Sequence, residues 1–277
     1  MRAVVSALVL AAMAVLPLRT LHAQKIDTSE KAVVAAAGDW VKAYEKDLAF
    51  VLADELAMQQ VTRSGSVAAE RRTRAEFFLT YLPQEGHWMA ARDVREADGA
   101  TVIDPDDIRA LIQRAPLWRL GAIVAEKNAR YNIGNVRRTF NEPTFALLVL
   151  DALHRRRFRF DRTVVSSGAA PVVTLTFTEK DRPTLISGMF GEPVYTNGEL
   201  DIDAATGRVQ RTRIAMALGP VRAEMTTSYA LDQKLGMWVP VSMHERYEQS
   251  AGPAPEVITV ESTYTNYQRF DATVIIK

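Results

Sequence analysis

Cysteine is absent from the 277 residues of the chain. Its absence excludes disulfide bonds, thiolate nucleophiles, cysteine-ligated metals and a lipid-modified N-terminal cysteine. Only four histidines are present, and no H-E-x-x-H or H-x-E pattern gives them metal-ligand spacing. We therefore expect no metal and no cofactor, and a fold that its hydrophobic core holds together without covalent links.

Excess charge of one sign is also lacking. The chain has 34 basic and 33 acidic residues, a formal net charge of +1. Without residues 1–23, which contain Arg2 and Arg19 and no acid, 32 basic and 33 acidic residues remain, a net charge of −1. A near-neutral surface gives nucleic acid or an anionic membrane no general electrostatic attraction. We expect no nucleic-acid partner.

A basic start and one apolar run open the chain. Residues 3–18 carry no charge, and Leu21-His22-Ala23 offers a small residue at a cleavage point. This layout is typical of a secretory signal peptide, and the run is short for a membrane span. We predict a signal peptide at 1–23 and a soluble mature protein at 24–277, exported to the periplasm or the extracellular space, with no integral membrane span. An uncleaved N-terminal anchor is the alternative, because Arg19 and Leu21 make an imperfect cleavage region.

The first half of the mature chain has helical patterns around two strands. Apolar residues recur at steps of three and four along 33–52, which predicts an amphipathic helix capped by Asp27 or Ser29, with a strand beginning after it. Residues 71–82 and 87–97 are predicted strands joined by the turn 83–86. Asp104-Pro105-Asp106-Asp107 is a helix start, and Pro116 divides the helical pieces 105–113 and 117–130. The short apolar run at 145–153 fits no element clearly.

From residue 157 onward the pattern becomes that of strands. Valine, threonine and aromatic residues alternate with polar residues, and turn sequences arrive about every ten positions. Short connections favour an antiparallel meander, since parallel neighbours need a long crossover. We predict one α+β domain over 24–277, with a large curved antiparallel sheet, a half-barrel, packed against N-terminal and inserted helices. Two subdomains divided near Asn141 are the alternative.

Methionines and one phenylalanine are the candidate ligand-binding residues. They fall on the apolar faces of the predicted strands, where flexible side chains can accept hydrophobic ligands of varied shape. Filling gaps in an ordinary core is the alternative role. The candidates are Phe177, Met216, Met225, Met237 and Met243.

No pattern of catalytic residues emerges, so we predict a non-enzyme. Serines at 64–66 and 166–167 lack the glycines of a nucleophile turn. Asp93 and Asp98 lie on opposite faces of one strand, and cross-strand ion pairs with Arg72 or Arg74 are their expected use. A hydrolase would require the fold to join Asp93 or Glu96 to His87 or His244. The three histidines of the mature chain are scattered, so a zinc site formed only in the fold also stays open.

Residues 154–160, His-Arg-Arg-Arg-Phe-Arg-Phe, are the most basic stretch. Alternation directs Phe158 and Phe160 inward and Arg157 and Arg159 outward, the pattern of a half-buried strand with a solvated face. The alternative is a docking patch for lipid headgroups or another envelope protein.

Several segments resemble a group of uncharacterised exported bacterial proteins. Those segments are residues 92–99, 129–136, 141–144 and 264–270. That group implies no activity. The order of elements, an amphipathic helix followed by hairpins and a long meander, also resembles the lipoprotein-carrier (LolA-like) superfamily. This resemblance implies a half-open barrel that is covered by helices and holds acyl chains. It transfers no functional residue, because fold alone does not confer function.

Two functions remain. The first is a non-catalytic periplasmic binding or carrier protein for a lipid or another hydrophobic ligand, held between the curved sheet and its helices. The second is a protein–protein interaction or envelope-scaffold module without a ligand. A filled core and an exposed apolar or arginine-rich patch would favour the second.

Overall fold

The computed structural model describes residues 26–103, 107–114, 117–139, 141–166, 170–188, 190–251 and 255–270. The predicted signal peptide at 1–23 lies outside these residues. So do Asp104, Pro105 and Asp106 of the predicted helix start, Pro116, and Ser167.

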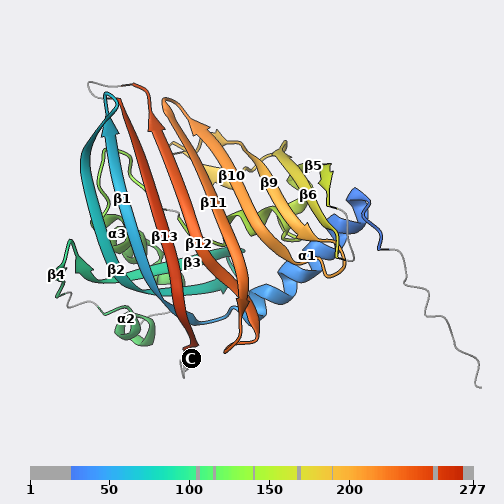
Figure 1. Ribbon diagram of the computed structural model, residues 1–277, viewed down its shortest axis with the longest axis horizontal. Helices are drawn as coiled ribbons and strands as arrows, with labels where there is room; N and C mark the ends of the chain where they lie inside the picture. The colour runs from blue at the N-terminus through green and yellow to red at the C-terminus, as the bar shows by residue number, and fades with distance from the viewer. Residues whose placement is uncertain are drawn as a thin grey trace, which may run out of the picture.

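One large antiparallel sheet dominates the molecule (Figure 1). It contains eleven strands in the order β4-β3-β2-β1-β13-β12-β11-β10-β9-β6-β5, and β7 and β8 form a separate hairpin. The strands are β1 (Val51–Arg63), β2 (Ser66–Leu82), β3 (His87–Ala97), β4 (Ala100–Thr101), β5 (Phe158–Val165), β6 (Val172–Glu179), β7 (Ile186–Ser187), β8 (Pro193–Val194), β9 (Thr196–Asp203), β10 (Val209–Leu218), β11 (Val221–Asp232), β12 (Met237–Gln249) and β13 (Glu256–Arg269).

The sheet continues across the two halves of the chain because β1 pairs with β13 along its whole length, from Val51 opposite Arg269 to Arg63 opposite Glu256. The sheet is curved but does not close, since β4 and β5 lie at its two ends. The expected α+β class with a large curved antiparallel meander is thus confirmed. The range 24–277 for a single domain stays a prediction.

Helix α1 (Glu30–Asp47) packs its apolar stripe against the inner face of the sheet. Ser29 caps it by accepting a hydrogen bond from the backbone N–H of Ala32, and Glu30 places an acid in the first turn. The helix ends earlier than its apolar period predicts. Val51 and Leu52 belong to β1, because Phe50 takes a left-handed conformation with φ of 54° and turns the chain into the strand.

The apolar run that fitted no element forms the 3₁₀ helix η1 (Phe145–Leu150), and all six of its residues are buried. It contacts α1, β3 and β10. Five strands separate β3 from β10 in the sheet, so the sheet curls around η1. A second 3₁₀ turn, η2 (Arg155–Arg157), leads into β5. We call residues 141–151, which include η1, the plug.

Helices α2 (Ile108–Arg114) and α3 (Leu117–Arg130) lie at the β2–β3 end of the sheet (Figure 1). Ile108, Leu120 and Val124 form a second core there with Phe78. Asn128 of α3 accepts a hydrogen bond from the N–H of Arg92 at 2.9 Å and donates to the carbonyl of Ala90 at 2.7 Å. The side-chain amide of Asn128 therefore pairs with two free backbone groups at the edge of β3, where another strand could otherwise add.

Gly198 in β9 provides a stability test, because an added Cβ would lie 1.9 Å from the carbonyl oxygen of Arg213 and 2.7 Å from the ring of Phe177. We expect Gly198→Ala to lower the free energy of unfolding by about 3 kcal/mol through overpacking. Gly121 in α3 has open space around its Cβ position, so Gly121→Ala should stabilise the protein by up to about 1 kcal/mol. Urea unfolding of both variants measures the two effects, and equal effects would contradict this packing.

Candidate functional site

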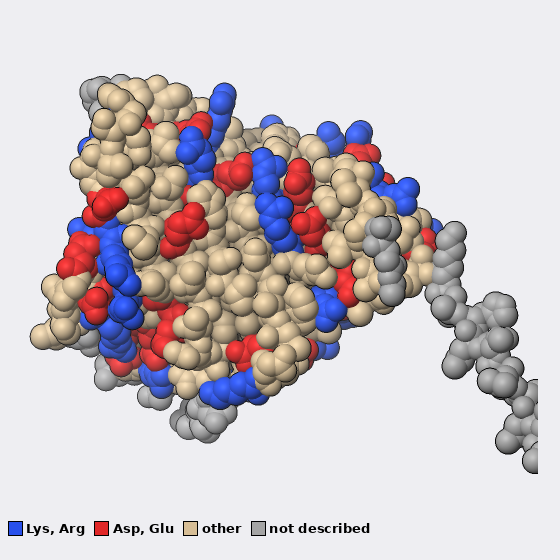
Figure 2. All heavy atoms as spheres, in the orientation of Figure 1, with Lys and Arg blue, Asp and Glu red and all other residues tan. Residues whose placement is uncertain are grey.

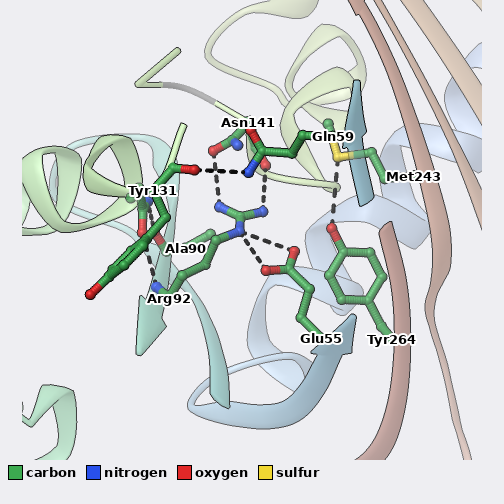
Figure 3. Close-up of polar contacts among 9 residues, drawn as sticks. Glu55, Gln59, Ala90, Arg92, Tyr131, Asn141, Met243 and Tyr264 are labelled. Atoms are coloured by element: carbon green, nitrogen blue, oxygen red, sulfur yellow. Dashed lines mark hydrogen bonds and ion pairs between the residues drawn. The ribbon is translucent and has the colours of Figure 1, made fainter. Parts of the chain in front are cut away.

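The inner face of the sheet is polar over the neighbouring strands β3, β2, β1, β13 and β12. Arg92 of β3 is buried there and donates from Nε to both carboxylate oxygens of Glu55 on β1, at 3.0 and 2.7 Å. Its Nη1 and Nη2 donate to the side-chain and backbone oxygens of Asn141, at 2.9 and 3.1 Å (Figure 3). Each of the three guanidinium nitrogens donates to a fixed acceptor, as a buried charge requires. Arg92 thus joins two strands to the start of the plug.

A second buried arginine, Arg138, lies just before the plug. Its Nη2 donates to the side-chain oxygen of Gln59 at 2.6 Å, and its guanidinium lies 5.6 Å from the centre of the Tyr247 ring. Gln59 in turn donates to the carbonyl of Tyr131 at 3.1 Å (Figure 3). It also accepts from the N–H of Ile133 at 3.2 Å. The segment between α3 and the plug is therefore fixed to β1 by side-chain hydrogen bonds.

A buried carboxylate completes this polar region. The hydroxyl of Tyr247 donates to Glu245, and both residues are almost fully buried. Burial raises the pKa of Glu245, while Arg138 opposes the rise. The network encloses a cavity of 30 Å³, enough for about one or two water molecules. Its lining includes Glu55, Gln59, Arg92, Arg138, Asn141 and Glu245.

Tyrosine hydroxyls hold the plug at both ends. Tyr229 on β11 donates to the carbonyl of Pro143 at 2.7 Å, just before η1. Tyr81 on β2 donates to the carboxylate of Asp151 at 2.6 Å, directly after η1. These contacts fix a segment whose own 3₁₀ hydrogen bonds have poor geometry. The plug is therefore held mainly by its surroundings.

Two carboxyl groups near the plug ends are shifted toward their protonated form. Burial raises the pKa of Glu142 to about 7, and Arg92 opposes the shift. Burial also raises the pKa of Glu45 on α1 to about 8, and a hydrogen bond with Asp151 adds to this rise. A proton on Glu45 allows its carboxyl group to lie beside that of Asp151.

The five predicted ligand-binding residues all belong to the main core cluster on the inner face. Their exposed fractions range from 1% for Met243 and Phe177 to 9% for Met237. Met243 accepts a contact from the hydroxyl of Tyr264 at 3.8 Å (Figure 3). Met225 and Met243 lie near one another across β11 and β12. Met216 lies near the β10–β11 turn and Met237 at the β11–β12 turn, so these two residues are at opposite ends of the strands. Their role as a ligand lining stays a prediction.

The structure does not bring His87 or His244 to Asp93 or Glu96, as a hydrolase site would require. His244 pairs with Glu261 and His87 with Glu85, both at exposed positions. Asp93 instead contacts Arg95 at 2.8 Å and Lys127 at 3.5 Å. The expected ion-pair partners Arg72 and Arg74 were wrong for this residue, because Asp93 faces α3 and its own strand neighbour Arg95. Asp98 pairs with Arg71 and accepts from the backbone N–H of Arg72.

Sequence reasoning predicted a strand after the first helix but assigned neither of its faces to the interior, and so missed the polar network. The structure buries Glu55, Ala57 and Gln59, while Met58 is 57% exposed. The alternation itself was a valid signal for a strand. The face could not be chosen, because the partners of Glu55 and Gln59 come from distant parts of the chain.

Within the described residues, no three His, Asp or Glu side chains are arranged to hold a metal ion. No helix in the same ranges combines the length and the apolar character that crossing a membrane demands.

The chain is similar to three solved structures over 88% of its length. A domain named for outer membrane lipoprotein sorting, from Vibrio parahaemolyticus, is 12% identical, with 94% of that chain covered and a TM-score of 0.39. A DUF1329 family protein from Desulfovibrio piger is 11% identical (93% covered, TM-score 0.37), and a LolA superfamily protein from Nitrosomonas europaea is 11% identical (95% covered, TM-score 0.34). No family model and no curated protein matches the sequence.

The buried ion pair makes a double-substitution test possible. Glu55→Met or Arg92→Met alone leaves one buried charge unpaired, so each should lower the free energy of unfolding by about 3–5 kcal/mol. The double variant should lose at least about 2 kcal/mol less than the sum of the single losses. Urea unfolding measures the coupling. The exposed pair Arg246–Glu248 is the control and should couple by less than about 1 kcal/mol, and equal coupling in both pairs would contradict the buried network.

The raised pKa values of Glu142 and Glu45 predict a stability that falls as pH rises. Each group keeps a proton in the folded state that the unfolded chain releases near its ordinary value of 4.5, so unfolding becomes easier between about pH 5 and about pH 8. The part due to Glu142 reaches up to about 3 kcal/mol.

We expect Glu142→Gln to be more stable than the wild type at pH 8 and to show a shallower pH slope in urea unfolding. Glu126→Gln, at an exposed position in α3, is the control and should keep the wild-type slope. Equal slopes in all three proteins would show that Glu142 ionises freely in the folded state.

Proposed function

We propose that the protein is a non-catalytic, exported binding protein or carrier for a lipid or another hydrophobic ligand, and that the plug occupies the place of this ligand in the free state. The filled interior is also what an interaction module without a ligand would have, and one observation favours the carrier. A buried apolar segment, η1, has neither sheet nor α-helix structure and lies on the inner face of the sheet. Two strands that are far apart in the curved sheet, β3 and β10, both contact it. A curved sheet around an exchangeable apolar filling has the geometry of a hydrophobic carrier.

The burial free energies of the two occupants, the plug and an acyl chain, are similar. The large apolar side chains of η1 represent on the order of 10 kcal/mol of burial, at about 2 kcal/mol each. A saturated acyl chain with about 15 methylene groups represents on the order of 12 kcal/mol, at ~0.8 kcal/mol each. Exchange of plug for ligand is therefore near balance, and the polar anchors at the plug ends decide its direction. The five side chains are Phe145, Leu147, Leu148, Val149 and Leu150.

The apolar part of the inner face supplies the remaining wall. Phe177, Met225 and Met243 are buried in the same cluster as η1. Methionine side chains adapt to a new neighbour at little cost because their three torsions rotate freely. Under the proposal, they contact the plug in the free state and the ligand after exchange.

Tyrosine-to-phenylalanine variants test the proposal without changing the shape of the core. Tyr81→Phe and Tyr229→Phe each remove one hydroxyl that holds the plug. A hydrogen bond of this kind contributes about 1 kcal/mol, so each variant should bind a fluorescent fatty acid such as cis-parinaric acid roughly fivefold to tenfold more tightly. Fluorescence titration measures the apparent Kd.

Tyr267→Phe is the matched control. Its hydroxyl also is buried and donates to a backbone carbonyl, that of Pro240 at 2.7 Å, but it does not contact the plug. This variant should lose similar stability and keep the wild-type affinity. Absence of fatty-acid binding in all four proteins, or the same gain in all three variants, would refute the plug as the ligand's place.

A further inference from the structure

Basic side chains concentrate at the end of the sheet where β5 begins and β6 ends. Residues 154–162 and 180–182 contain seven basic and two acidic side chains, although the whole chain has a net charge of only +1. Strand pairing joins the two segments, since the N–H of Lys180 donates to the carbonyl of Arg157 at 2.7 Å. Figure 2 shows Lys and Arg side chains at this end of the molecule. The arginine-rich surface consists of Arg156, Arg157, Arg159, Arg162, Lys180 and Arg182.

The positive charge of this surface is largely uncompensated. Arg159 pairs with Asp161 at 2.9 Å, but Arg156, Arg157 and Lys180 have no acidic partner among the residues that the structure describes. Several arginines elsewhere on the sheet are matched with acids. Those pairs include Arg211–Asp201, Arg213–Glu224 and Arg246–Glu248. Near-zero net charge thus hides a local excess of positive charge.

An exposed aromatic ring lies at the tip of the adjacent hairpin. Phe190, between β7 and β8, is 91% exposed. The turn that presents it is hydrogen-bonded: the N–H of Gly188 donates to the carbonyl of Glu192 at 2.8 Å, and the N–H of Phe190 to the Glu192 side chain at 2.9 Å. Gly191 has a φ of 80°, which suits glycine. The outward direction of the ring therefore follows from a defined turn.

The base of this hairpin is fixed next to the arginine-rich surface. Glu179, the last residue of β6, accepts hydrogen bonds from the N–H groups of Leu185 at 2.7 Å and Thr196 at 3.1 Å. Arg182 donates to the hydroxyl of Tyr195 at 3.3 Å. Residues 180–195 thus form one excursion from the sheet that carries both positive charge and the exposed phenyl ring.

We propose that this end of the molecule, the arginine-rich surface together with Phe190, docks onto an anionic lipid surface. Basic side chains are attracted to anionic headgroups, and an aromatic ring beside them can enter the interface between headgroups and acyl chains. Several unpaired cations and one protruding aromatic ring suit a fluid charged surface, which needs no shape complementarity. The docking does not depend on the proposed ligand, because no residue of the arginine-rich surface lies on the buried part of the inner face.

Vesicle flotation of the purified mature protein tests this docking. We expect binding to vesicles of phosphatidylcholine with phosphatidylglycerol, little binding to phosphatidylcholine alone, and release at high salt. The triple variant Arg156→Gln/Arg157→Gln/Lys180→Gln should reduce the partition coefficient by about 100-fold, since each basic residue near an anionic surface contributes roughly fivefold. Phe190→Ser should reduce it by about tenfold.

Matched controls change the same residue types elsewhere. Arg211→Gln/Arg222→Gln/Arg246→Gln removes three basic residues from β10–β12, and Leu231→Ser removes an apolar side chain that is 45% exposed. Both should keep wild-type binding. Lipid docking would be overturned by equal binding to neutral vesicles or by equal losses in the controls. It would also be overturned if the protein bound immobilised polyglutamate but no vesicles, and that result would assign the surface to an acidic protein. Fatty-acid titration of the triple variant measures the proposed carrier function by itself, so that a failure of the docking and a failure of the carrier function can be distinguished.

Discussion

The buried guanidinium of Arg92 is the constraint on which the inner side of the molecule depends. A buried cation requires an anion and further acceptors, and here β1 supplies Glu55 while the plug supplies Asn141. The strands, the plug and the segment before it must therefore take up their positions together. The same requirement explains why a sheet face that normally would be apolar carries charge in this part of the fold.

The inner face consequently holds the plug in two different ways. Its apolar part offers burial to η1, and this contribution depends on area more than on direction, so another apolar chain can replace it. Its polar part fixes the ends of the plug through hydrogen bonds with strict geometry, at Asn141 and Asp151. Under the proposed exchange, the apolar middle of the plug leaves its place and the anchored ends set the direction of the exchange. The raised pKa values of Glu142 and Glu45 would then make this exchange dependent on pH.

Period and turn chemistry were sufficient to predict the sheet-rich second half, because each strand from β5 onward alternates apolar and polar residues and ends at a turn sequence. The helix α1 also followed from its apolar stripe, apart from its last residues. Neither the plug nor the polar network could be predicted. Phe145–Leu150 is apolar throughout and has no period, so its burial on all sides left no pattern to distinguish a helix from a strand. Glu55 and Arg92 could not be recognised as a buried pair, because the two residues are remote from one another in sequence.

Hydrogen–deuterium exchange of the mature protein, with and without a saturating long-chain fatty acid, tests the central claim most directly. If ligand and plug compete for one place, the amides of residues 141–151 exchange faster in the presence of the fatty acid, while those of β11, β12 and β13 keep or increase their protection. Unchanged or slower exchange of the plug in a protein that demonstrably holds the fatty acid would contradict the account, and would show that the plug is a permanent part of the core.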